Sequence, residues 1–126
     1  MISADTSSLS NFFKGTGTAD ALLVRRALLD ESLVLSPVVV AELLSSPKMS
    51  ESLRKIIADI PVLELKDGFW ERVGLNRAVI LQTGKKARLA DSMIATSCMD
   101  HSIAIISSDT DYRHFTEHFG LEVHTG

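Results

Sequence analysis

Acidic residues at four well-separated places in the chain are the side chains best suited to chemistry. They are Asp5, Glu42, Asp91 and Asp109, with Asp111 as a candidate fifth. Clustered carboxylates repel, at roughly 4 kcal/mol for two charges 4 Å apart in an intermediate dielectric. A fold that gathers them usually offsets the repulsion with a divalent cation, most often Mg²⁺ or Mn²⁺. These residue types therefore indicate metal-assisted phosphodiester chemistry.

The elements expected around these residues alternate between strand and helix. Strands are expected over 1–5, 33–36, 61–65, 103–107 and 121–124, and helices over about 7–14, 18–30, 37–45, 50–58, 67–83, 90–100 and 110–118. This alternation predicts an α/β fold with a mainly parallel central sheet covered on both faces. In the helix over 67–83, apolar residues at helical spacing predict a core-facing stripe. They are Phe69, Trp70, Val73, Ile80 and Leu81.

A parallel topology brings the acidic residues to one edge of the sheet. Ligands bind beyond the carboxyl ends of parallel strands, and Asp5 and Asp109 each follow a strand directly. The helix that contains Glu42 starts at such an end. The helix that Asp91 opens precedes a strand and runs antiparallel to it, so it begins at the same edge. Each residue alone could be a cap, a turn residue or a solvent-facing side chain, but together they favour a metal site.

The composition is that of a globular protein with a real hydrophobic core. The chain has 126 residues, 45% of them apolar and 23% charged, and we expect one domain over 1–126. No apolar run approaches the roughly 20 residues that span a bilayer, and no signal peptide is visible. A single cysteine, Cys98, excludes an internal disulfide. We therefore expect a cytoplasmic protein without a membrane segment.

The net charge of −3 gives no support to a general nucleic-acid binder. It does not exclude one, because the carboxylates of a metal site are neutralised when the ion binds. Local basic groups near the site matter more than the overall charge. They occur at Arg25-Arg26, Lys85-Lys86-Arg88 and Arg113-His114, and any one of them is more often a solvated helix face.

Four short motifs occur in order along the chain. They are Asp5-Thr6-Ser7-Ser8-Leu9, Val39-Val40-Ala41-Glu42-Leu43-Leu44, Leu89-Ala90-Asp91-Ser92-Met93-Ile94-Ala95 and Ser107-Ser108-Asp109-Thr110-Asp111-Tyr112. Together they resemble the PIN domain, specifically the small VapC-type toxins of prokaryotic type II toxin–antitoxin systems. The resemblance covers essentially the whole chain, and four motifs in register are more specific than any one of them.

The resemblance implies a three-layer α/β/α sandwich with Mg²⁺- or Mn²⁺-dependent endoribonuclease activity. The residues that would hold the metal and carry the catalysis are Asp5, Glu42, Asp91 and Asp109. The residues that would orient a carboxylate or a water are Ser7 and Ser107, with Asp111 as further support. Contacts to RNA phosphates would come from Arg88 or Arg113.

The resemblance also implies a small antitoxin that masks the acidic groove, often by inserting a basic side chain, and a homodimer. Surplus apolar residues on the helices around 20–29 and 50–58 could form these interfaces or belong to the core. Two alternatives stay open: a catalytically silent PIN fold that serves as an RNA- or protein-binding scaffold, and a housekeeping RNA-maturation nuclease without an antitoxin. The intact acidic set argues against the silent scaffold, which has no reason to bear the electrostatic cost.

Overall fold

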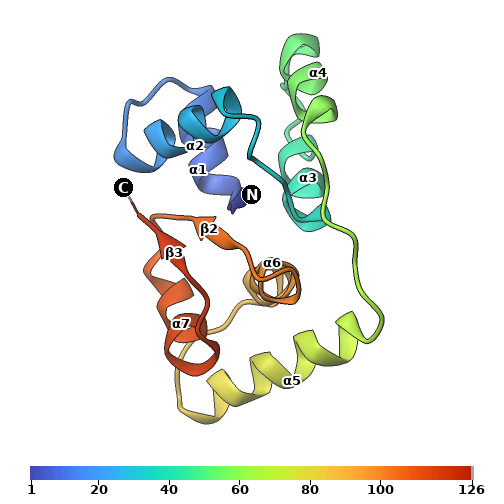
Figure 1. Cartoon of the computed structure of the whole chain (residues 1–126), viewed down its shortest axis with the longest axis vertical. Coiled ribbons are helices and arrows are strands. Elements are labelled where there is room, and N and C mark those ends of the chain that lie inside the picture. Colours follow the sequence, from blue (N-terminus) through green and yellow to red (C-terminus); the bar gives the residue numbers. More distant parts are fainter. Residues whose placement is uncertain (126) are drawn as a thin grey trace.

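The computed structural model describes residues 1–125 and confirms the α/β class, with helices packed around a parallel sheet (Figure 1). In chain order the elements are β1 (Ile2–Ala4), α1 (Thr6–Phe13), α2 (Ala19–Leu29), α3 (Pro37–Leu44), α4 (Glu51–Asp59), α5 (Phe69–Gln82), α6 (Leu89–Asp100), β2 (Ala104–Ile106), the 3₁₀ turn η1 (Thr110–Tyr112), α7 (Arg113–Phe119) and β3 (Val123–His124). Within residues 1–125, no helix is long and apolar enough to cross a membrane.

The sheet runs in the order β1-β2-β3, and both strand pairs are parallel. Within residues 1–125, the sheet continues beyond the free side of β1 only through single bridges, from Ile2 to Leu33 and from Leu35 to Val62. The predictions of full strands over 33–36 and 61–65 are therefore wrong. The chain there is extended, but each segment shares too few backbone hydrogen bonds with its neighbour to form a ladder.

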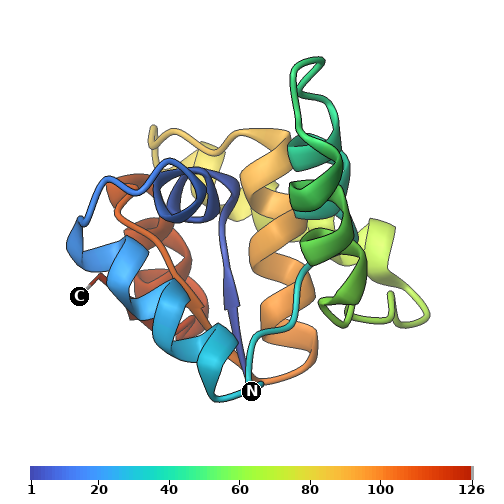
Figure 2. The same cartoon turned by 90° about the horizontal axis from the view of Figure 1, so that it is seen from above.

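Helices cover both faces of the sheet, as the sandwich prediction requires. Figure 2 shows α2 and α6 on opposite sides of β1 and β2, and both helices contact β2. The core between these layers contains the fully buried side chains of Leu9, Leu35, Val39, Ile94 and Ile105. Helix α3 packs against both α1 and α6. As a result, α3 and the first turns of α1 and α6 lie around the same edge of the sheet.

The helix predicted over 67–83 is α5, which begins after Gly68 in the left-handed region at φ 79°. Phe69, Val73 and Ile80 are buried as predicted. Trp70 and Leu81 are wrong as core residues, because they are 62% and 44% exposed. Apolar residues occupy more than one face of α5, and the face packed on α6 covers only some of them.

Candidate metal centre

The predicted acidic residues converge on a pocket at the carboxyl edge of the sheet. Its volume is about 160 Å³. At roughly 30 Å³ per water molecule, it has room for about five waters, enough for a cation that keeps part of its hydration shell. We call it the acidic pocket, and it is lined by Asp5, Thr6, Ser7, Glu42, Arg88, Asp91, Ile94, Asp109 and Tyr112.

Asp5 follows β1 and is held by three hydrogen bonds. Its Oδ1 accepts from Ser7 Oγ at 2.9 Å and from the Ser8 backbone N–H at 3.0 Å. Its Oδ2 accepts from Ser107 Oγ at 2.7 Å, although Ser107 lies 102 positions later in the chain. Asp5 also caps the N-terminus of α1. The carboxylate is thus fixed jointly by the ends of β1 and β2, and both predicted serines contact it.

Asp91, Asp109 and Asp111 form a close group, with one carboxylate oxygen from each within 4.8 Å of the others. A tight turn after β2 places two of these three residues, because Asp109 Oδ1 accepts from the Asp111 backbone N–H at 2.9 Å. The Asp109 N–H in turn donates to Ser107 Oγ at 3.0 Å. Helix α6 begins at Leu89, so Asp91 is its third residue rather than its opening one. Asp111, predicted only as support, lies within this group.

The electrostatics of Asp91 show a carboxylate that lacks a partner. Burial, reinforced by the charges of Asp109 and Asp5, raises its pKa to about 6, and Arg88 opposes the shift. Its Oδ2 atom is buried and finds no hydrogen-bond donor among residues 1–125. A desolvated carboxylate oxygen costs free energy unless a proton or a cation binds it. Hard oxygen ligands are those that Mg²⁺ and Mn²⁺ prefer, so these residues fit a divalent cation.

Glu42 lines the same pocket from α3 but lies outside the close group. Its Oε1 accepts a hydrogen bond of 2.6 Å from Thr6 Oγ1, which ties α3 to the start of α1. The residue is exposed. This placement suits a ligand that acts through water, since Mg²⁺ keeps several waters. Sequence reasoning missed Thr6, although it follows Asp5 directly.

The two predicted arginines have different positions. Arg88 lines the acidic pocket at the start of α6. Arg113 lines a neighbouring hollow that also contains Asp109. Of these two arginines, only Arg88 lines the acidic pocket itself.

Tyr112 is a pocket residue that sequence reasoning did not single out. Its side chain is 1% exposed, and its buried hydroxyl has no hydrogen-bond partner within the described part of the chain. Burial raises the pKa of this phenol, so the hydroxyl keeps its proton. The motif indicates an aromatic residue after Asp111, but no sequence signal distinguishes its hydroxyl from the ring of an ordinary core residue.

Residues 2–117 match the family model of the PIN domain. The chain therefore belongs to the PIN domain family. It is 28% identical over 120 residues to Ribonuclease VapC11 of Mycobacterium tuberculosis, covering 89% of both chains. It shows the same identity and coverage with VapC ribonuclease Mb1587 of Mycobacterium bovis.

Solved structures agree on the fold. The chain is similar to VapBC2 from Rickettsia felis bound to a DNA fragment from their promoter, with a TM-score of 0.75 and 16% identity over 98% of both chains. It is also similar to VapBC-5, a member of the VapBC family of toxin–antitoxin systems from Mycobacterium tuberculosis. There the TM-score is 0.69 at 19% identity, covering 97% of this chain and 95% of the other. These likenesses confirm the PIN fold.

Proposed function

We propose that this protein is a Mg²⁺- or Mn²⁺-dependent endoribonuclease and the toxin of a toxin–antitoxin pair. The observation that carries the proposal is the close group of Asp91, Asp109 and Asp111 beside a fixed Asp5. The names of the ribonuclease relatives support the reaction class. A silent scaffold would have no use for an unpartnered carboxylate oxygen in such acidic surroundings.

The carboxylates proposed to hold the ion are Asp91, Asp109 and Asp111, with Asp5 and Glu42 acting directly or through water. A bound ion would polarise the scissile phosphate and lower the pKa of a water. Ser107 keeps Asp5 and the turn at Asp109 in a fixed relative position through its own hydrogen bonds. This pre-organisation matters because even a small displacement of reacting groups is costly.

Basic side chains would place the RNA backbone. Arg88 lines the acidic pocket and is our first candidate for a phosphate contact. Arg113 lines the neighbouring hollow instead. A protein with a net charge of −3 cannot rely on its overall field, so local charge must do the positioning.

The direct test is cleavage of a mixed RNA pool with Mg²⁺, with Mn²⁺ or with EDTA. We expect cleavage with either ion and none with EDTA. Cleavage that EDTA does not affect would contradict the metal-dependent mechanism, because the carboxylates alone supply neither a nucleophile nor charge neutralisation.

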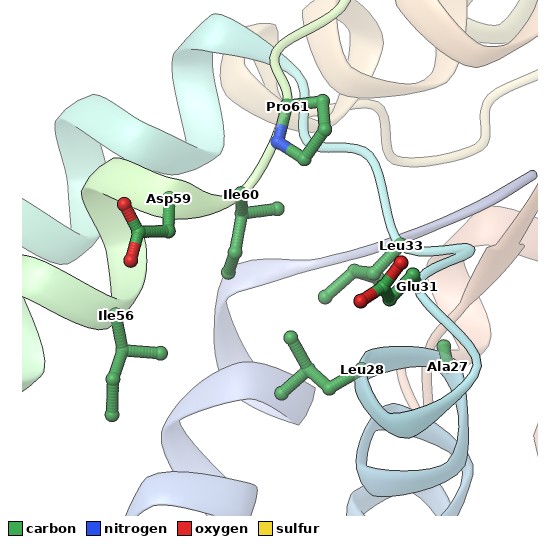
Figure 3. A pocket seen from close by; sticks show the side chains of 8 residues that line it. All are labelled: Ala27, Leu28, Glu31, Leu33, Ile56, Asp59, Ile60 and Pro61. Carbon is green, nitrogen blue, oxygen red and sulfur yellow. The ribbon is translucent and has the colours of Figure 1, made fainter.

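A second surface fits the antitoxin that such a toxin requires. The groove between α2 and α4 has a volume of about 460 Å³. In Figure 3 the side chains of Leu28 from α2 and Ile60 from the end of α4 point into the same space, with the carboxylates of Glu31 and Asp59 nearby. An apolar groove flanked by acids suits a protein segment with apolar and basic side chains.

We also propose that the protein forms a homodimer and is located in the cytoplasm.

The partner is tested by co-expression with the short reading frame expected next to the gene. Ile56→Asp places a charge in the α2–α4 groove at a residue that is 43% exposed, so the fold should tolerate it. Leu75→Asp on α5 is the matched control at a 68% exposed leucine outside this groove. We expect co-purification to be lost only with Ile56→Asp. Equal co-purification of both variants would contradict the assignment of this groove.

A further inference from the structure

Two hollows adjoin the acidic pocket, and they differ in charge. One shares Asp109 with it, and its other charged lining residues are Arg113, Glu117 and Glu122. The second shares Thr6 and Glu42 with it and lies between α1, α3 and the start of α4. Because acids outnumber bases in the first hollow, a polyanion entering the acidic pocket is better accommodated on the second side.

We call the second hollow the lysine pocket, since Lys14 and Lys48 line it. Both side chains are exposed, and Glu42 is the one acid among its lining residues. That acid already accepts a hydrogen bond from Thr6 Oγ1. Two exposed ammonium groups beside the acidic pocket can therefore neutralise phosphates that flank the scissile one.

The floor of the lysine pocket is apolar. Phe13, Met49 and Leu53 line it and are half-buried, so part of each side chain faces the hollow. Its volume is about 230 Å³, less than the roughly 300–1,000 Å³ of a pocket for a drug-sized ligand. A nucleobase presents a flat π face that packs on aromatic and apolar side chains. The size and the lining suit one unpaired base.

We propose that the lysine pocket holds a nucleotide of single-stranded RNA next to the scissile phosphate, with its base on the apolar floor and two flanking phosphates, one near Lys14 and one near Lys48. The inference rests on the ribonuclease function proposed above and adds the direction in which the strand leaves the acidic pocket. It also adds a requirement for an unpaired base, because a base held within a duplex cannot turn into the floor.

Binding is tested in an Asp91→Asn background, where RNA should stay intact, by fluorescence anisotropy of a labelled single strand over a range of salt. Lys14→Gln with Lys48→Gln should reduce the slope of log affinity against log salt by about 1.4, at roughly 0.7 for each lost phosphate contact. The control is Lys55→Gln with Lys66→Gln, two exposed lysines outside the lysine pocket that give the same change in net charge. Phe13→Leu should weaken binding of the single strand by about tenfold, with little effect on a duplex.

The outcomes separate this inference from the proposed function. If the wild-type protein cleaves RNA and the Asp91→Asn protein binds it, while the lysine pair changes the slope no more than its control, the lysine pocket is not the subsite. If the pair abolishes antitoxin binding and leaves RNA binding unchanged, the hollow belongs to the protein partner and the inference is wrong. If the wild-type protein neither binds nor cleaves RNA, the proposed function fails, and the subsite fails with it.

Discussion

Asp20 is buried and Asp91 is half-buried, and the pKa values of these two carboxyl groups shift in opposite directions. Asp20 in α2 is 3% exposed and accepts a hydrogen bond of 3.1 Å from Asn11 Nδ2. Burial alone would raise its pKa, but polar groups of Thr18, Ser8, Asn11 and Ala21 together lower it.

Asp91 has no such set of donors. Burial and the neighbouring carboxylates Asp109 and Asp5 raise its pKa to about 6. A carboxylate whose partners are built into the fold serves structure, whereas one left among other carboxylates is suited to a cation. The contrast predicts that one residue supports stability and the other supports activity.

The largest expected effect is the loss of cleavage on removal of the Asp91 charge. Asp91→Asn should reduce Mn²⁺-dependent cleavage at least about 100-fold, or about 2.7 kcal/mol of activation free energy, because this carboxylate would be lost from the residues proposed to hold the ion that activates water. Thermal melts in EDTA should show no destabilisation. Asp20→Asn is the matched control and should retain cleavage at a temperature where it is folded. A comparable loss of cleavage in both variants would contradict the claim that Asp91 supports activity and Asp20 supports stability.

The second effect is on stability. Asp20→Ala should lower the free energy of unfolding by about 1–3 kcal/mol, because the half-buried Asn11 amide that donates to Asp20 loses its acceptor. Chemical denaturation measures this directly. Asp91→Ala should cost much less, since it also relieves repulsion. If the two alanine variants are equally unstable, the Asp91 carboxylate is structural after all.

The third effect is a pH dependence of the metal-free protein. The folded pKa of Asp91, about 6, lies above its ordinary value of 3.8. Its protonated form therefore favours the native state, fully so below pH 3.8, and this stabilisation is lost as pH rises through about 6. Asp20 has the opposite sign, because its lowered pKa contributes stability that is lost at acid pH. Melts in EDTA between pH 4 and pH 7 should show a decline toward pH 7 that Asp91→Asn reduces. An identical profile in that variant would contradict the assignment.

The smallest effect concerns the Tyr112 hydroxyl. Tyr112→Phe removes a buried polar atom that has no hydrogen-bond partner in residues 1–125. The metal-free protein should keep its stability or gain up to about 1 kcal/mol, because an unsatisfied buried hydroxyl is a cost. Urea unfolding in EDTA measures the change, with Tyr112→Leu as a control that also removes the ring. A clear loss of stability in the phenylalanine variant would mean that the hydroxyl has a partner.

Much of the site could be predicted because the order of strands and helices determines where its acidic residues lie. Once strands and helices alternate, Asp5 and Asp109 must lie at the carboxyl edge of a parallel sheet, whatever the details of packing. The hydrogen bond from Ser107 to Asp5 then depends only on the ends of two adjacent strands.

Other features depend on tertiary contacts that a local pattern does not contain. The segments at 33–36 and 61–65 look like strands, but in the folded chain they pair only through single bridges within residues 1–125. In α5, apolar residues lie on several faces, so periodicity could not tell that Trp70 would stay exposed. The inclusion of Asp111 in the close group follows from the turn geometry at Asp109, which a two-residue spacing alone does not specify.

Calorimetric titration of the purified protein with Mn²⁺ near pH 7 tests the central claim most directly. We predict binding at or below millimolar concentrations to the wild-type protein, strongly weakened in Asp91→Asn and unchanged in Asp59→Asn, an exposed carboxylate outside the acidic pocket. Below pH 6, protons should compete with the ion at Asp91 and affinity should fall. The absence of binding at millimolar Mn²⁺, or equal binding by wild type and Asp91→Asn, would contradict the metal centre.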